Sequence, residues 1–271
     1  MEDLKSSVRD YWQASPCGRD LYLQGTPSER ENFLRQEEVR YTLEPYIKTF
    51  ADFASYNQKQ VLEIGVGLGA DHLQFARAGA VLHGIDLTTQ AIEYTGKRLE
   101  IFGLASVLAA GDAEHLAFPD NTFDLVYSWG VLHQSPDTPQ AIREAYRVLK
   151  PGGHAKIMIY HTYSLVGYML WLRYALLRGR PWMSLKDMYF QYLESPGTKA
   201  YSCDEARALC AQFARVDIET VLTHGDLLAS QAGQRHRGWL LTLAKRIWPR
   251  KLLAHFCKNH GLFMLITANK A

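Results

Sequence analysis

The chain has 271 residues, of which 47% are hydrophobic and 21% are charged, and its formal net charge is +2. These values are ordinary for a globular protein and exclude a mainly disordered chain. The length is sufficient for one large domain, or for one domain with a cap. The four cysteines show no CxxC spacing, which excludes a zinc ribbon and argues against a disulfide framework. No metal site is predicted.

The sequence shows no export signal and no membrane span. The start, Met1 to Lys5, is polar, unlike a signal peptide. The longest apolar run, residues 163–177, contains Arg173 and is shorter than the ~20 residues that cross a bilayer. These features predict a cytoplasmic protein, with peripheral contact to a membrane as an alternative to free solution.

Charge is distributed unevenly along the chain. Residues 1–144 contain 12 Lys and Arg against 21 Asp and Glu, whereas residues 145–271 contain 18 against 7. No acidic residue follows Asp226, although eight basic residues do. Such asymmetry is typical of proteins that meet an anionic substrate, a membrane or a nucleic acid, but the two halves could equally neutralise each other after folding.

The expected elements divide the chain into four parts. Residues 1–56 are predicted to be helical, and their Tyr11 and Trp12 either close over a ligand or pack in the core. Residues 57–160 alternate between short apolar runs and amphipathic stretches, which predicts a doubly wound, mostly parallel α/β sheet. Residues 161–200 are rich in Trp, Tyr, Leu and Arg and are predicted to be a cap over the acceptor, with a small satellite core at the sheet edge as the alternative. Residues 201–271 complete the core and include a basic helical insertion at 229–260.

Seven strands and four core helices are predicted. The strands span residues 61–64, 81–85, 106–109, 125–128, 155–160, 216–222 and 262–268. The last two form an antiparallel edge pair unless residues 229–260 supply a crossover. Three helices span residues 71–78, 89–102 and 139–149, and the stretch 150–153 is predicted to turn the chain into the next strand. A Ser-x-x-Glu capping box at Ser202 predicts a fourth helix, to about Phe213.

The most informative motif lies between the first strand and the first core helix. Gly65, Gly67 and Gly69 remove side chains from this turn, so a ligand can lie against bare backbone. In an open α/β sheet, ligands bind beyond the carboxyl ends of the strands. Four further motifs follow in order: Gly84-Ile-Asp86, Gly111-Asp-Ala-Glu114, Phe123-Asp-Leu-Val-Tyr-Ser128 and Leu149-Lys-Pro-Gly-Gly153. Together with Glu63-x-Gly65-x-Gly67-x-Gly69, they resemble the class I S-adenosylmethionine-dependent methyltransferases, closely over residues 57–160 and loosely over 200–271.

This resemblance implies a Rossmann-like, seven-stranded sheet and S-adenosyl-L-methionine as the cofactor. An ionised carboxylate offers two acceptor oxygens, which suits Asp86 to the two ribose hydroxyls. The remaining cofactor-binding roles follow the family pattern: Gly65, Gly67 and Gly69 beside the methionine part, Glu63 toward its ammonium group, Leu87 against the adenine, Asp112 and the amide of Ala113 at the adenine edge, and the backbone of Ser128 and Trp129 beside the sulfonium.

Two alternatives stay open for these residues. Gly65-x-Gly67-x-x-Ala70, with Asp86 21 positions after Gly65, also fits a dinucleotide-binding fingerprint, although the downstream motifs favour the methyltransferases. Asp86 could instead cap the helix that begins near Thr88, and Asp112 could cap a turn.

His133 and His161 are the predicted catalytic residues. They follow the fourth and fifth strands, whose ends face the ligand side of such a sheet. An ordinary histidine pKa of about 6.5 suits proton transfer near neutrality. His161-Thr162 resembles the cyclopropane fatty acid synthase relatives, but those have a glutamate where His133 stands. Alternatively, His133 packs against the cofactor and His161 caps a strand end.

The predicted function is methylation of a small-molecule or lipid-like acceptor at oxygen, nitrogen or carbon. The aromatic cap at 161–200 suits an apolar or aromatic acceptor, and the basic C-terminal half would also accept an anionic one. The alternatives are an RNA or protein methyltransferase, and a cofactor-binding protein without turnover. Residues 236–258 combine Trp and Leu with basic residues, which suits a lid helix or contact with an anionic membrane.

Overall fold

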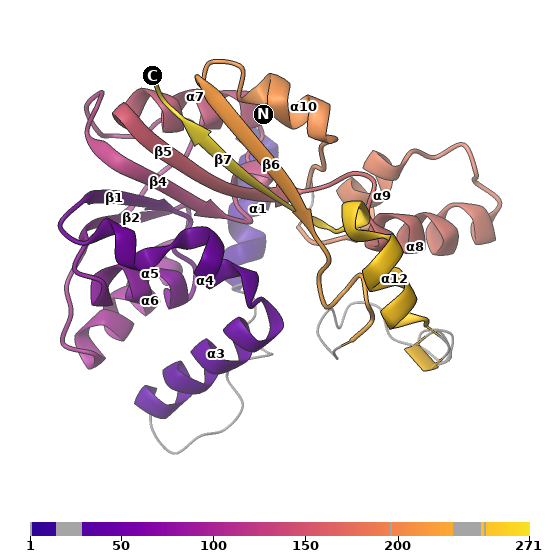
Figure 1. The fold of residues 1–271 in the computed structure, drawn as a ribbon, viewed down its shortest axis with the longest axis horizontal. Coiled ribbons are helices and arrows are strands. Elements are labelled where there is room, and N and C mark those ends of the chain that lie inside the picture. The colour runs from indigo at the N-terminus through magenta and orange to yellow at the C-terminus, as the bar shows by residue number, and fades with distance from the viewer. Residues whose placement is uncertain (1, 15–28, 196, 230–244, 247) are drawn as a thin grey trace.

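The computed structural model describes residues 2–14, 29–195, 197–229, 245–246 and 248–271. Seven strands form one sheet in the order β3-β2-β1-β4-β5-β7-β6 (Figure 1). The strands are β1 (Gln60–Ile64), β2 (Val81–Asp86), β3 (Val107–Ala110), β4 (Phe123–Trp129), β5 (Leu149–Tyr160), β6 (Arg215–Val221) and β7 (Phe263–Asn269). Strands β1 to β5 are parallel, and β7 is antiparallel to both β5 and β6. The predicted mixed sheet and its antiparallel edge pair are confirmed.

Helices cover both faces of the sheet because successive strand residues point to opposite faces. One face carries α5 (Ala70–Arg77) and α6 (Thr89–Ile101), whose Leu73 and Leu99 pack with Val61 and Leu125. The other face carries α7 (Thr138–Val148) and α10 (Cys203–Leu209). Its buried apolar side chains include Ile64, Ile142, Ile157, Ala206 and Ile266. Because β1 pairs in parallel with both β2 and β4, the carboxyl ends of these three strands lie together at one edge of the sheet.

Two predicted boundaries are wrong. The sequence 150–153 was expected to be a turn, but β5 begins at Leu149, directly after α7. Pairing with other strands keeps these residues extended. Leu149 lies opposite Phe123 in β4, with a shift in register before Leu125, and the backbone N–H of Gly152 donates a hydrogen bond to the carbonyl oxygen of Lys270. Helix α10 has the predicted capping box at Ser202 but ends at Leu209, short of Phe213.

The N-terminal segment is built onto the core. It contains α1 (Glu2–Ala14), α3 (Glu29–Leu43), α4 (Tyr46–Ala51) and the 3₁₀ turn η1 (Phe53–Tyr56). The fully buried guanidinium of Arg98 in α6 donates hydrogen bonds to the side chain of Gln36 and to the carbonyl oxygens of Phe33 and Leu68. One buried cation therefore joins α3 to α6 and to the glycine turn.

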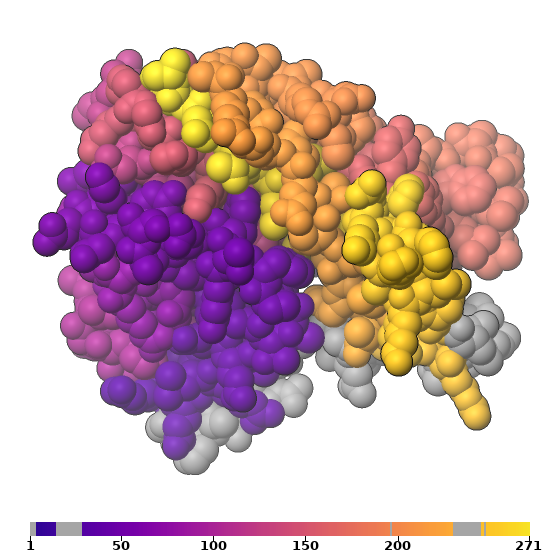
Figure 2. Space-filling view, in the orientation of Figure 1, coloured from indigo at the N-terminus to yellow at the C-terminus, as the bar shows by residue number. Residues whose placement is uncertain are grey.

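The predicted cap is a helical hairpin that projects from the side of the molecule (Figures 1 and 2). It contains α8 (Leu165–Tyr174), the 3₁₀ turn η3 (Leu176–Arg178) and α9 (Leu185–Tyr192). Beside it lie α12 (Arg250–Phe256), which begins directly after Pro249, and η4 (Lys258–His260). Residues 230–244 and 247 of the predicted basic insertion lie outside the described residues. Within the described parts of the chain, no helix combines the length and apolarity needed to span a bilayer.

A buried carboxylate fastens the cap to the sheet. Asp226 is fully buried, and its Oδ1 accepts a hydrogen bond from the backbone N–H of Val166 at the start of α8 (3.1 Å). Its Oδ2 accepts three more, from the N–H and hydroxyl of Thr223 (both 2.8 Å) and from the N–H of Leu262 (2.9 Å). These bonds tie the cap, the loop after β6 and the residue before β7 together.

Candidate active site

The glycine turn leaves bare backbone beside the end of β1. Gly65 and Gly67 both have positive φ, +85° and +51°, a conformation that side chains disfavour. A Cβ added to Gly65 would lie 2.1 Å from Cγ2 of Val131, so this position is closed by packing. A Cβ on Gly67 would meet no atom within 4 Å. Gly67 therefore faces open space, and a ligand can approach its backbone directly.

Asp86 joins the tips of β1 and β2. Its Oδ2 accepts a hydrogen bond from the N–H of Gly67 (3.1 Å), and its Oδ1 accepts from the N–H (2.9 Å) and hydroxyl (2.8 Å) of Thr88. The N-cap of α6 is Thr88, whose Oγ1 accepts from Ala91. Asp86 is therefore not itself the helix cap. Burial raises the pKa of Asp86, and the hydrogen bonds to its carboxylate oppose that rise.

Asp112 follows β3 and is held from two sides. Its Oδ1 accepts the N–H of Glu114 (2.9 Å), as expected of a residue that caps a turn, and its Oδ2 pairs with Lys5 of α1 (2.7 Å). The Lys5 ammonium also pairs with Glu114 (2.5 Å). One potential metal-ligand atom each of Asp112, Glu114 and His115 lies within 4.8 Å of the others. The Lys5 ammonium already supplies a positive charge to both carboxylates at this place. Ala113 packs on the core next to this turn.

Helix α1 reaches the loop after β4 as well. The indole N–H of Trp12 donates to Oε1 of Gln134 (2.5 Å), which also accepts from the hydroxyl of Ser195 (3.1 Å). The amide nitrogen of Gln134 donates to the carbonyl of Gly130 (3.1 Å) and to Glu194 (3.3 Å). Gln134 thus joins the N-terminal helix, the β4 loop and the end of the cap. No sequence pattern marked it.

Glu63 lies beneath the glycine turn. Its carboxyl group is buried 2.9 Å from Nδ1 of His72 in α5, and Nε2 of His72 lies 2.8 Å from the hydroxyl of Ser106. The Ser106 hydroxyl donates to Leu82, so it accepts from Nε2–H, which leaves Nδ1 as an acceptor. Burial raises the pKa of Glu63 and lowers that of His72 to about 3. The pair is therefore uncharged, and contact between Glu63 and a ligand ammonium stays a prediction.

Sequence reasoning missed the role of Asp71. This carboxylate, in the first turn of α5, accepts two hydrogen bonds from Arg40 (3.0 and 2.6 Å) and one each from the hydroxyls of Tyr41 and Tyr127 (both 2.9 Å). Burial opposes its ionisation, but the charge of Arg40 and these hydrogen bonds outweigh burial and lower the pKa of Asp71. An acidic residue in a first helical turn was the available signal, but its partners are 30 or more residues away.

The side chains of Ser128 and Trp129 serve packing. The hydroxyl of Ser128 is buried and donates to the carbonyl of Ile64 (3.0 Å). The Trp129 ring lies among Tyr46, Phe50 and Phe263, with ring centroids 5.7–6.1 Å apart. The hydroxyl of Ser128 is thus occupied, which leaves its backbone for the predicted ligand contact, whereas the Trp129 side chain stays partly exposed. The partly buried Leu87 follows Asp86 at the end of β2.

His133 is fully buried on the 3₁₀ turn η2 (Leu132–Gln134), after β4. Its ring lies 4.2 Å from that of Tyr160, centroid to centroid. Neither ring nitrogen has a hydrogen-bond partner among the described residues. Burial lowers the pKa of His133 to about 3. The expectation of an ordinary histidine pKa is wrong here, because the site desolvates the ring, which stays neutral at pH 7.

His161 sits just beyond β5 in a strand-end role. Its backbone N–H donates to the carbonyl oxygen of Leu262 (2.8 Å), and its ring nitrogen Nδ1 lies 3.3 Å from the carbonyl oxygen of Gly261. It also forms an isolated bridge with Tyr201. Burial lowers the pKa of His161, although the contact with Gly261 favours the protonated form. This geometry matches the strand-capping alternative, and a catalytic role stays a prediction.

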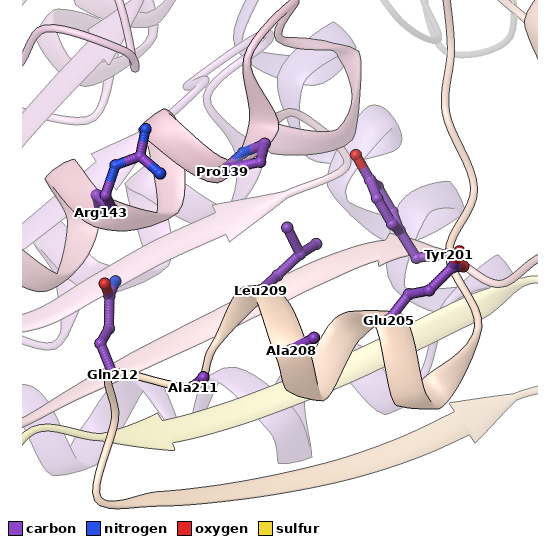
Figure 3. Close-up of a pocket in the computed structure, with 8 residues that line it drawn as sticks. All are labelled: Pro139, Arg143, Tyr201, Glu205, Ala208, Leu209, Ala211 and Gln212. Atoms are coloured by element: carbon purple, nitrogen blue, oxygen red, sulfur yellow. The ribbon is translucent and has the colours of Figure 1, made fainter.

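A separate groove lies between α7 and α10 (Figure 3). Pro139 and Arg143 line one side, and Leu209 and Gln212 line the other, with Tyr201 at one end. None of its lining residues is among those predicted to bind a cofactor or to act in catalysis. The groove therefore does not mark the predicted site.

The sheet order, the bare turn after β1 and the carboxylates after β2 and β3 define the class I methyltransferase fold. Residues 62–157 match a family model described as a methyltransferase domain. Over 158 residues, the chain is 31% identical to a demethylmenaquinone methyltransferase of Tropheryma whipplei (strain Twist), covering 57% of this chain and 65% of that protein. A fatty-acid O-methyltransferase of Mycolicibacterium smegmatis is 38% identical over 117 residues, 42% of each chain.

A solved structure of phosphoethanolamine N-methyltransferase 2 from Haemonchus contortus has the same fold, with a TM-score of 0.63 and 18% identity over 97% of this chain and 60% of that one. Residues 62–157 therefore match a methyltransferase domain, and the similarity to S-adenosylmethionine-dependent methyltransferases expected from the sequence is confirmed by this match and by the relatives. The chain spans less than two thirds of the two sequence relatives, 65% and 42% of their lengths.

Proposed function

We propose that this protein transfers a methyl group from S-adenosyl-L-methionine to a small-molecule or lipid-like acceptor. The observation that carries the proposal is the open space at Gly67, together with carboxylates at the ends of β2 and β3, the two strands on one side of β1 in the sheet. Asp86 already accepts a hydrogen bond from Gly67, and Asp112 follows β3, the strand that pairs with β2. Backbone and carboxylates of this kind match a polar, hydroxyl-bearing nucleoside.

The chain's residues fit this cofactor. Gly65 and Gly67 would lie beside its amino-acid part, Asp86 would accept its ribose hydroxyls, and Asp112 with the Ala113 amide would meet its adenine. Leu87 would pack against the adenine, and the backbone of Ser128 and Trp129 would lie near its sulfur. When bound, the cofactor supplies an activated methyl group, so the protein's main tasks are orientation and exclusion of water.

Helix α1 is suited to exclude water from the site. Lys5 binds the carboxylates of the β3–β4 loop, and Trp12 binds Gln134 after β4. Both contacts place α1 beside loops that follow the carboxyl ends of the strands, where ligands bind in this fold. We infer that α1 covers the cofactor once it is bound.

His133 is proposed to contact the acceptor as a neutral ring. A buried polar group without a partner is unusual in a native protein and points to a missing ligand or water. Since its pKa is about 3, the ring is neutral at pH 7, with one ring nitrogen able to donate a hydrogen bond and the other able to accept one. It would orient a polar group of the acceptor beside Tyr160.

The acceptor class is proposed from the surroundings of His133 and from the relatives. The rings of Trp129, Tyr160 and Phe263 gather near the ends of β4 and β5, which favours an acceptor with an apolar or aromatic part. Two of the similar proteins are named for demethylmenaquinone and for fatty acids, both lipophilic compounds.

Titration calorimetry with S-adenosylhomocysteine tests the cofactor assignment. The wild type should bind, and Asp86→Ala should bind at least about tenfold more weakly, because a hydrogen bond to a charged group contributes about 1.5–3 kcal/mol. Asp217→Ala, on the exposed edge strand β6, is the matched control and should bind like the wild type. Absence of binding by the wild type, or preferential binding of a nicotinamide dinucleotide, would overturn the proposal.

A further inference from the structure

The cap and α12 carry most of the large hydrophobic side chains that are exposed in the described chain. Nine of the twelve large hydrophobic side chains that are exposed lie in residues 163–190 or 252–256. The most exposed are Trp182 (77%), Phe256 (73%) and Leu177 (68%). Scattered single apolar residues are normal on a protein surface, but a concentration of this kind marks an interaction site.

Some of these side chains share one side of a helix. Tyr168 and Leu172 are four positions apart on α8, and Leu252 and Phe256 have the same spacing on α12. Residues four apart lie on the same side of a helix. The ring of Tyr168 lies 5.8 Å from that of His260 in η4, so the first turn of α8 contacts the 3₁₀ turn that follows α12. We call this combined region the cap–α12 surface.

The cap–α12 surface is strongly basic. Residues 163–192 contain four Lys and Arg against one acid, and residues 245–260 contain five against none. Several of these cations are exposed next to exposed apolar residues: Arg178 follows Leu177, and Lys251 precedes Leu252. The hairpin projects from the body of the molecule, with its tip at the side (Figure 2). Its apolar residues can therefore reach a flat partner before the body does.

We propose that the cap–α12 surface docks onto an anionic lipid bilayer. Aromatic and leucine side chains would enter the interfacial region, and the neighbouring Lys and Arg would remain at the level of the lipid phosphates. Exposed leucines gain nothing from nucleic-acid phosphates, whereas a lipid interface removes them from water. The combination of Leu177 and Trp182 with adjacent arginines therefore favours lipid over RNA.

Flotation with liposomes tests this proposal on the full chain. The wild type should float with vesicles of phosphatidylcholine and phosphatidylglycerol at low salt, but not with phosphatidylcholine alone. Leu177→Ser/Trp182→Ser should reduce binding at least tenfold, and Arg178→Glu/Arg180→Glu should do the same. The control is Val107→Ser, a 59% exposed apolar residue on the opposite edge strand β3, which should bind like the wild type.

The outcomes separate this proposal from the proposed function. All variants should retain S-adenosylhomocysteine binding, which shows that they are folded and that the cofactor site is independent of docking. The proposal is overturned if the wild type fails to bind anionic vesicles at low salt, or if Val107→Ser weakens binding as much as the cap variants do. Binding of single-stranded RNA by the wild type without vesicle binding would make the surface a nucleic-acid site instead.

Discussion

The neutral His133 ring makes a quantitative prediction about pH and stability. Its pKa is about 3 in the folded protein because burial disfavours the charged ring, whereas the unfolded chain titrates near 6.5. Between these two pKa values, His133 is protonated in the unfolded state but not in the folded state. The unfolding free energy therefore decreases as the pH falls below 6.5. Between pH 7.5 and pH 5.0 this one group should cost about 2 kcal/mol of unfolding free energy.

Urea unfolding of the wild type and His133→Gln at both pH values measures this cost. Other titrating groups are the same in both proteins, so their contributions cancel in the difference. On acidification, the wild type should lose about 2 kcal/mol more than the variant does. Leu132→Ala, at a buried position in the same turn, should be destabilised equally at both pH values. If the wild type and His133→Gln differ by the same amount at both pH values, the imidazole is not desolvated as described and the reasoning is refuted.

Three further predictions concern the turn, the cap and a buried acid. Gly65→Ala should lower the unfolding free energy by about 2 kcal/mol, because φ is +85° and Val131 is too close, and should abolish S-adenosylhomocysteine binding in calorimetry. Asp226→Ala should lower the unfolding free energy measured in urea by about 3 kcal/mol, because loss of the carboxylate removes four hydrogen bonds and leaves buried N–H groups unpaired. A loss below about 1 kcal/mol would show that the cap is not fastened there. Burial raises the pKa of Glu44 to about 7 against the attraction of Arg40, so stability falls as the pH rises through 7. Between pH 5 and pH 8 the unfolding free energy of the wild type should fall by about 2 kcal/mol more than that of Glu44→Gln. Equal losses in both proteins would contradict this.

The local chemistry of the core was readable from the sequence. The apolar pattern of the strands predicted the positions of β1, β2 and β4. The glycines of the first turn predicted both the backbone conformation of that turn and its accessibility to a ligand. The capping box at Ser202 predicted where α10 begins. These features depend on residues close together in the chain, so their patterns reflect local conformation. The start of β5 was missed because its first residues extend by pairing with distant strands.

The electrostatic state of the site could not be read in the same way. Glu63 was predicted from its place at a strand end, but its partner is a histidine on the helix that packs against that strand. His133 was assigned an ordinary pKa, although the fold removes both water and hydrogen-bond partners from its ring. Burial and partners are properties of the packed chain, and they decide a pKa.

By itself, the sequence determined the sheet, the bare glycine turn and the acids that follow the next two strands, because each is written in a short run of residues. The tertiary structure alone decided which groups meet above that turn. It brought Lys5 to Asp112 and Trp12 to Gln134, contacts that join residues 107 and 122 positions apart. It also left His133 neutral, because the folded chain sets the local dielectric and the available partners, and neither is encoded in the spacing of residues.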